Sequence, residues 1–171
     1  MAFNVNVFNS CKFLAIRVKR YDPNATTADI VVSNIDPTIT GSYTAAINYD
    51  ATTGRGIINI PTENLSSKNG VFKVCVVENS IEVACKPVLI KCDIDCCLVK
   101  LTDELIDCSC DCPRCAKTLA KAQKVFLLLQ SAQSAVDIAS TDVNNTGYHL
   151  DILEKYNKAR EICDNSCGCD C

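Results

Sequence analysis

The hydrophobic periodicity of the chain changes near residue 91, and this change constrains the fold more than any other feature. Residues 11–91 contain six short runs that alternate or are wholly apolar, among them CKFLAIRVKRY, GVFKVCVVE and IEVACKPVLIK, and turn-forming segments such as DPNATT separate them. Alternation at a period of two and enrichment in Val, Ile, Thr and Tyr are typical of strands. Residues 1–91 are therefore predicted to form an antiparallel β-sandwich domain of immunoglobulin-like or fibronectin-like architecture.

After residue 91 the apolar residues recur every three or four positions, which predicts helices. We expect a junction helix over residues 93–107 and then a helical hairpin over residues 113–163. Its first helix runs from Pro113 to about Ala139, and its second begins near His149. Proline suits the first turn of a helix, because the missing N–H would have no partner there. The predicted fold class is α+β, with residues 92–171 forming a cysteine-rich helical domain.

The helix predicted to start at Pro113 is apolar over most of its circumference. Leu119, Phe126 and Leu129 fall on one line of this helix, and Val125 and Ala132 fall on an adjacent line. An apolar stripe of this width needs more than one partner. Two partners are equally compatible with the pattern: a neighbouring subunit, or the sandwich of the same chain.

Composition and cysteine content bound the class of protein. The chain has 171 residues, 48% of them hydrophobic, and 14 cysteines. This length is enough to bury a core without cross-links. The first 20 residues lack the pattern of a signal peptide, and no apolar stretch approaches the roughly 20 residues that cross a bilayer. We therefore expect synthesis in a cytosol and no membrane partner. Thiols stay reduced in a cytosol, although a particle that leaves its cell can oxidise.

Eight of the cysteines form two dense blocks, CSCDCPRC and CDNSCGCDC. At about 1.5 Å per residue, the second helix of the hairpin returns far enough to bring both blocks to the open end of the hairpin. The hairpin is thus predicted to be clasped by cysteines. The candidate site, for metal or for disulfides, consists of Cys108, Cys110, Cys112, Cys115, Cys163, Cys167, Cys169 and Cys171.

Two chemistries are open for this site, and a redox alternative accompanies them. Two residues separate Cys112 from Cys115, a common spacing for ligands of structural zinc, so zinc is the expected ion if the site binds metal. Disulfides would close the same hairpin covalently. CPRC at a helix N-terminus also resembles a redox motif, because the helix dipole favours a thiolate, but the usual preceding strand is missing.

The remaining cysteines lie outside these blocks. A two-residue turn at residues 79–80 would place Cys75 opposite Ala84, so that Cys75 and Cys85 point to opposite faces of the sheet. Core filling is therefore predicted for these two cysteines and for Cys11. A further group, at the junction of the two domains, is predicted to offer a link to the sandwich or to the main blocks: Cys92, Cys96 and Cys97.

Motifs for catalysis and for nucleic-acid binding are missing from the sequence. The single histidine, His149, is predicted to be a surface or capping residue, and we find no phosphate-binding glycine loop, HExxH or GxSxG motif. Residues 1–91 hold nine basic and seven acidic side chains, a net charge of +2, whereas residues 92–171 hold eight and thirteen, a net charge of −5. Without a dense basic patch, we expect no specific nucleic-acid partner and no catalytic residues.

The junction VLIKCDIDCCLVKL, the CSCDCPRC block and the alanine-rich helix after it resemble small virion proteins of crAss-like and related tailed bacteriophages. The resemblance covers residues 71–171 best. It implies a structural protein, an oligomeric ring or adaptor subunit at the head-to-tail neck or in the tail. The implied partners are portal, neck or tail subunits and further copies of the chain. The implied location is the virion, assembled in the cytoplasm of the host bacterium.

A second function stays open beside the virion protein. Cysteine-rich chains of this size also occur as cytosolic metal-binding or thiol-redox adaptor proteins, and the two cysteine blocks suit that reading as well. Metal content and thiol oxidation state distinguish the two functions.

Overall fold

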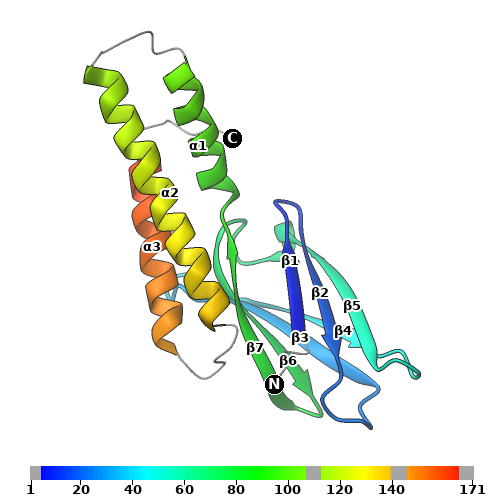
Figure 1. Ribbon diagram of the computed structural model, residues 1–171. Coiled ribbons are helices and arrows are strands. Elements are labelled where there is room, and N and C mark those ends of the chain that lie inside the picture. The colour runs from blue at the N-terminus through cyan, green and yellow to red at the C-terminus, as the bar shows by residue number, and fades with distance from the viewer. Residues whose placement is uncertain (1–4, 107–112, 140–145, 166–171) are drawn as a thin grey trace.

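The computed structural model describes residues 5–106, 113–139 and 146–165. Figure 1 shows strands in the first part of the chain and helices in the second, so the α+β class is confirmed. The elements are β1 (Val5–Asn9), β2 (Phe13–Lys19), β3 (Thr27–Asn34), β4 (Ser42–Asn48), β5 (Arg55–Pro61), the short 3₁₀ helix η1 (Thr62–Asn64), β6 (Gly70–Glu78), β7 (Ile81–Ile90), α1 (Cys92–Ile106), α2 (Pro113–Ala139) and α3 (Thr146–Asp164).

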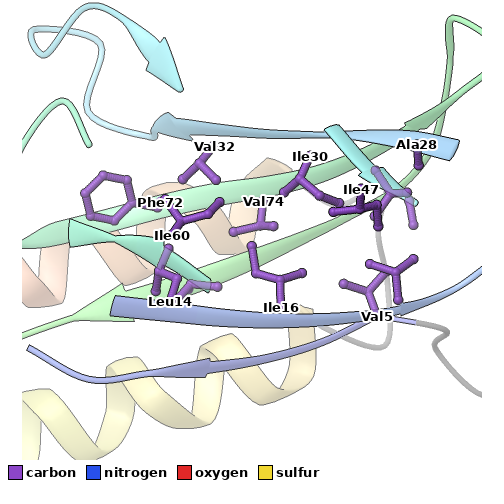
Figure 2. Packing of buried hydrophobic residues seen from close by; sticks show 14 of the residues in the cluster. Val5, Leu14, Ile16, Ala28, Ile30, Val32, Ile47, Ile60, Phe72 and Val74 are labelled. Carbon is purple, nitrogen blue, oxygen red and sulfur yellow. The ribbon is translucent and has the colours of Figure 1, made fainter. Parts of the chain in front are cut away.

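The strands form two antiparallel sheets, ordered β1-β2-β5 and β4-β3-β6-β7. Their inner faces pack on each other, and Figure 2 shows Leu14 and Ile16 of one sheet opposite Ile30 and Val74 of the other. The alternation seen in the sequence produces this core, because every second side chain of β2 and β3 points inward. Gly56 lies at a close approach of the chain, since a Cβ there would lie 2.9 Å from Cδ1 of Ile47 and 3.2 Å from the carbonyl oxygen of Asn48.

The first strand was not among the six runs predicted from the sequence. β1 is only five residues long and contains two asparagines, so its alternation is weak. It pairs along its whole length with β2, where Val5 lies opposite Val18, and its Val5 side chain is buried in the core between the sheets. Pairing with a strong neighbouring strand thus outweighs the low strand propensity of asparagine.

The β6–β7 hairpin differs from its predicted register. The turn has two residues as expected, and Asn79 and Ser80 both have positive φ, 51° and 64°. A bulge between Val76 and Val77, however, shifts the pairing by one residue, so Cys75 lies opposite Cys85. The prediction that these two cysteines point to opposite faces and only fill the core is therefore wrong.

The three helices form one layer, in which α2 packs on β7 and α3 packs on β6. α2 and α3 lie side by side and run in opposite directions, with α1 beside α2 (Figure 1). Their shared core includes Val71 of β6 and Leu89 of β7. Of the two partners considered for the wide apolar helix, the sandwich of the same chain does contact α2. No helix among the described residues is both long and apolar enough to span a bilayer.

The predicted apolar lines of α2 have different environments. Val125 and Ala132, on one line, are buried, as is Leu129 on the other. Phe126, although it was predicted on the same line as Leu129, is 58% exposed, and Leu127 is 62% exposed. The sandwich and the two other helices therefore cover only part of the apolar surface of α2.

Candidate functional site

Disulfides join the sandwich to the helical layer and join the helices to one another. Among the described residues, Cys11 after β1 bonds to Cys92 at the start of α1, and Cys97 of α1 bonds to Cys163 near the end of α3. Cys75 and Cys85 form a third bond across the β6–β7 hairpin. Two further cysteines, Cys96 and Cys115, are also disulfide-bonded. We call the region around Cys11, Cys92, Cys97 and Cys163 the braced junction.

Two of the eight predicted site residues lie in the described part of the chain. Cys163 is buried in α3 and bonded to Cys97, and Cys115 lies half-buried in the first turn of α2, where it is disulfide-bonded. The other six lie outside the described residues: Cys108, Cys110, Cys112, Cys167, Cys169 and Cys171. Whether the two blocks meet, and the redox role of Cys112 with Cys115, stay predictions.

The cysteines at the domain boundary have the linking role that their position predicts. Cys92 connects to the sandwich, and Cys97 connects to Cys163 of the second block. Cys97 continues the buried line of Ile94 and Leu101 on α1, which aims its sulfur at α3. Cys11, in contrast, was wrongly predicted to fill the core. It lies exposed in the β1–β2 turn, next to the start of α1, because the turn interrupts the alternation.

Hydrogen bonds fix the start of α1 against the sandwich. The Asn69 side-chain oxygen accepts bonds from the backbone N–H groups of Cys92 (3.0 Å) and Asp93 (3.4 Å). Free N–H groups at a helix N-terminus need such acceptors, so Asn69 caps α1 from the loop before β6. The Asn9 side chain donates to the carbonyl oxygen of Leu89 (2.9 Å), which ties β1 to the end of β7.

A buried tyrosine connects α3 to the same place. The Tyr156 hydroxyl donates to Oδ2 of Asp93 at 3.0 Å, and Nε of Arg160 lies 3.9 Å from that oxygen. Burial, followed by the negative charge of Asp93, raises the pKa of Tyr156 above its usual range. The phenol thus stays protonated and holds α3 on the first turn of α1.

A second carboxylate and tyrosine lie in the sandwich, at the end of β6. Glu78 is buried and accepts bonds from the backbone N–H groups of Tyr21 (3.0 Å) and Asp22 (2.8 Å) and from the Tyr49 hydroxyl (2.7 Å). Burial and then the Glu78 carboxylate raise the pKa of Tyr49. Because both carboxylate oxygens have partners, this cluster is suited to holding the β2–β3 loop rather than to acid–base chemistry.

One group of described residues has the composition of a metal site. The ligand atoms of Cys75, Glu82 and Cys85 lie within 4.8 Å of one another. The two sulfurs are bonded to each other, however, and the Glu82 carboxylate lies 3.5 Å from Nζ of Lys73. Zinc binds thiolates, so this group is closed to metal while the disulfide is intact.

The single histidine lies where the sequence predicts, in the first turn of α3. His149 is half-buried, and burial, followed by the positive charge of Lys73 on β6, lowers its pKa. A neutral imidazole is therefore favoured near neutral pH. This position fits packing of the helix start on the sheet.

Comparisons with known proteins identify no family for this chain. No protein-family model matches the chain, and no curated protein is significantly similar to it. One similar solved structure is a family 76 glycoside hydrolase from a bovine Bacteroides thetaiotaomicron strain, with 15% identity and a TM-score of 0.39. The match covers 91% of this chain and 37% of that one. At this identity and TM-score, the similarity supports no assignment of fold family or function.

Proposed function

We propose that the protein is a structural virion protein of a tailed bacteriophage, an oligomeric ring or adaptor subunit at the head-to-tail neck or in the tail. Its partners are portal, neck or tail subunits and further copies of itself, and its location is the particle. The protein has no enzymatic role. The sequence resemblance of residues 71–171 motivates this function, and the uncovered apolar surface of α2 carries it.

That surface, which we call the α2 patch, consists of Leu119, Phe126, Leu127 and Ile138. All four side chains are exposed although α1, α3 and the sheet already pack on other sides of α2. Single exposed apolar residues are ordinary on protein surfaces, but several large ones along one helix are typical of a surface that binds another protein. An adaptor subunit needs such a surface.

The braced junction supports the same function. Cys11–Cys92 and Cys97–Cys163 join segments that are 81 and 66 residues apart in sequence, so the two modules are covalently tied. A subunit that transmits force between the head and the tail of a particle benefits from such ties. We further propose that the sandwich is immunoglobulin-like, which the division of its strands into sheets of three and four supports.

Incorporation into particles tests the proposal. We expect antibody labelling of the native particle to place the chain at the neck or tail, and we expect Phe126→Ser with Leu127→Ser to reduce incorporation strongly. Ile81→Ser is the matched control, because Ile81 is equally exposed but lies at the β6–β7 turn. Particles that form normally without the chain, or a chain found only in the host cytosol, would refute the function.

A second function is a cytosolic metal-binding or thiol-redox adaptor, and the group Cys75, Glu82 and Cys85 favours it. Reduction would free two thiolates beside a carboxylate. Zinc titration of the reduced protein, with Cys75→Ser as the control, tests this alternative. Uptake of zinc that requires Cys75 supports it, whereas an absence of Cys75-dependent zinc binding excludes it for this group.

A further inference from the structure

The outer face of the β1-β2-β5 sheet carries a cluster of positive charge. Arg17 and Lys19 are two residues apart on β2 and therefore project from the same face. The strand register places Ile57 opposite Arg17 and Arg55 opposite Lys19. Lys19 and Arg55 are therefore two cations directly opposite each other on neighbouring strands, and their repulsion is unfavourable while no partner with negative charge is bound. We call Arg17, Lys19, Arg55 and Ile57 the basic face.

The basic face is hollowed. A groove of about 370 Å³ is lined by Asn6, Arg17, Lys19, Arg55 and Ile57. Among the described residues, no carboxylate forms an ion pair with any of these three cations, and Arg17 instead lies 5.4 Å from the ring centroid of Phe8. The groove therefore combines uncompensated positive charge with the exposed side chain of Ile57.

The outward side of α1 has the opposite charge and a similar mixture of groups. Val99, Asp103 and Ile106 recur every three or four residues and share one side of α1, where Val99 and Ile106 are 60% and 76% exposed. Glu104 is exposed on an adjacent side of the helix. Neither carboxylate forms an ion pair with a described residue. Of the four acidic residues of α1, Asp95 pairs with Lys91, and Asp93 contacts Arg160 and Tyr156. Asp103 and Glu104 together with Lys100 leave this part of the helix with a net charge of −1. We call Val99, Asp103, Glu104 and Ile106 the acidic ridge.

We propose that the basic face of one copy binds the acidic ridge of a second copy. This inference rests on the proposed function, because it names the contact that would build the ring. Apolar side chains lie beside opposite charges on the two surfaces, and a convex helix suits a hollow sheet face. Charge complementarity of this kind fixes orientation and speeds association. Because each copy carries both surfaces, a second copy of the chain has the surface that the basic face requires.

The positions of the two surfaces make the contact head-to-tail. The acidic ridge belongs to the helical layer, whereas the basic face lies on the sheet across the sandwich from that layer (Figure 1). The surfaces therefore do not overlap, and one copy can use both at once. Such a contact between two different surfaces closes into a ring when the rotation per copy permits, and otherwise propagates as a filament.

Charge-reversal variants of the oxidised full-length protein test the contact. We would make a sheet variant, Arg17→Glu with Arg55→Glu, and a helix variant, Asp103→Lys with Glu104→Lys. Sedimentation analysis over a range of protein and salt concentrations measures self-association. Each variant alone should associate about tenfold more weakly or worse, because like charges then meet. Lys68→Glu and Glu63→Lys, at exposed sites outside both surfaces, are the matched controls and should associate normally.

Mixing the two variants gives the sharper result. The reversed sheet of one variant matches the reversed helix of the other, so the mixture should recover association that neither variant shows alone. This recovery also excludes misfolding as the cause of the loss. The inference is overturned if the wild-type protein stays monomeric at high concentration and low salt, or if the mixture fails to recover.

Two further outcomes distinguish a failure of the proposed contact from a failure of the proposed function. If the chain is incorporated into particles but the reversals leave incorporation and self-association unchanged, the function stands and the contact is wrong. If the sheet variant instead loses binding to a duplex oligonucleotide while wild-type copies do not associate, the basic face serves nucleic acid and the contact is wrong. Failure of the chain to enter particles, with the mixing result intact, refutes only the phage function.

Discussion

The sandwich and the helical layer are stabilised in different ways. The sandwich encloses its core between two sheets, and its largest fully buried side chains include Leu14, Ile30 and Phe72. Four of the fifteen buried residues in the helical core are alanines, against three of eighteen in the sandwich core. The helical core also includes side chains from the outer face of a sheet. A buried alanine removes less apolar area from water than a buried Leu or Ile, so at roughly 25 cal/mol per Å² these alanine positions contribute less to stability.

The disulfides among the described residues are also distributed differently between the two layers. Both bonds of the braced junction end on helices, whereas the bond inside the sandwich spans only ten residues of a hairpin that its own strand pairing already holds. A cross-link that closes a long loop removes more entropy from the unfolded chain than one that closes a short loop. The comparison teaches that the sandwich is stabilised mainly by packing, and the helical layer by packing together with covalent ties.

Among the variants proposed here, the largest expected effect comes from removing the bond between α1 and α3. Cys97→Ser with Cys163→Ser should lower the free energy of unfolding by about 4 kcal/mol, from the loop of 66 residues that the bond closes. Urea unfolding followed by circular dichroism gives this number. Hydrogen exchange should show lost protection in α1 and α3 and little change in the strands.

The matched control is Cys75→Ser with Cys85→Ser in the hairpin. Its loop of ten residues corresponds to about 3 kcal/mol on the same relation, and the loss of protection should stay local to β6 and β7. If this pair costs more than the helical pair, or if the helices keep their protection without Cys97, then covalent ties do not distinguish the two layers.

The second expected effect concerns the buried carboxylate of the sandwich. Glu78→Ala leaves the Tyr49 hydroxyl and the N–H groups of Tyr21 and Asp22 without their acceptor and should cost about 3 kcal/mol. Denaturant unfolding measures the loss. Glu63→Ala is the control, because Glu63 is exposed on η1 and should change stability by less than about 0.5 kcal/mol. A small effect at Glu78 would mean that packing alone holds the β2–β3 loop.

Much of this architecture was predictable from periodicity. The bounds of α2 agree with the prediction from Pro113 to Ala139, and all six predicted strand runs became strands. Periodicity missed β1, because a five-residue strand with two asparagines gives a weak signal and is held by its neighbour. The wide apolar stripe of α2 left the sandwich as one of two possible partners, but periodicity did not identify β6 and β7, since Val71 and Leu89 look like any other strand residues.

The cysteines were harder to predict for a physical reason. Pairing depends on positions in three dimensions, so a single bulge at Val76 was enough to bring Cys75 opposite Cys85. The buried line of α1 would have pointed to Cys97 as a partner for the third helix, because Ile94 and Leu101 lie one turn on either side. Spacing within the dense blocks indicates neither which cysteines pair nor their oxidation state.

The third expected effect tests the small residues of the helical layer. Ala132 is fully buried on α2, so Ala132→Leu forces three extra carbons into a close-packed core and should cost about 2 kcal/mol. Ala116→Leu, at an exposed position on the same helix, is the control and should be near neutral. Urea unfolding of both variants measures the difference. A stabilising Ala132→Leu would show that the helical core holds unfilled space.

The smallest expected effect concerns the hydroxyl that ties α3 to α1. Tyr156→Phe removes the bond to Asp93 and should lower the free energy of unfolding by about 1 kcal/mol at neutral pH. The raised pKa of Tyr156 adds a dependence on pH. The folded protein keeps this proton where the unfolded chain loses it, so the contribution is complete below about pH 10 and is lost as the pH rises above it.

Above about pH 10 the wild-type protein should therefore lose stability more steeply than Tyr156→Phe, by up to about 1.4 kcal/mol per pH unit, the slope for one proton. Unfolding at a series of pH values measures both slopes. Tyr49→Phe provides the comparison with the sandwich, because burial raises the pKa of Tyr49 as well. Parallel slopes for the wild type and Tyr156→Phe would mean that this phenol ionises freely in the folded protein, and that α3 is held on α1 by Cys97–Cys163 and packing alone.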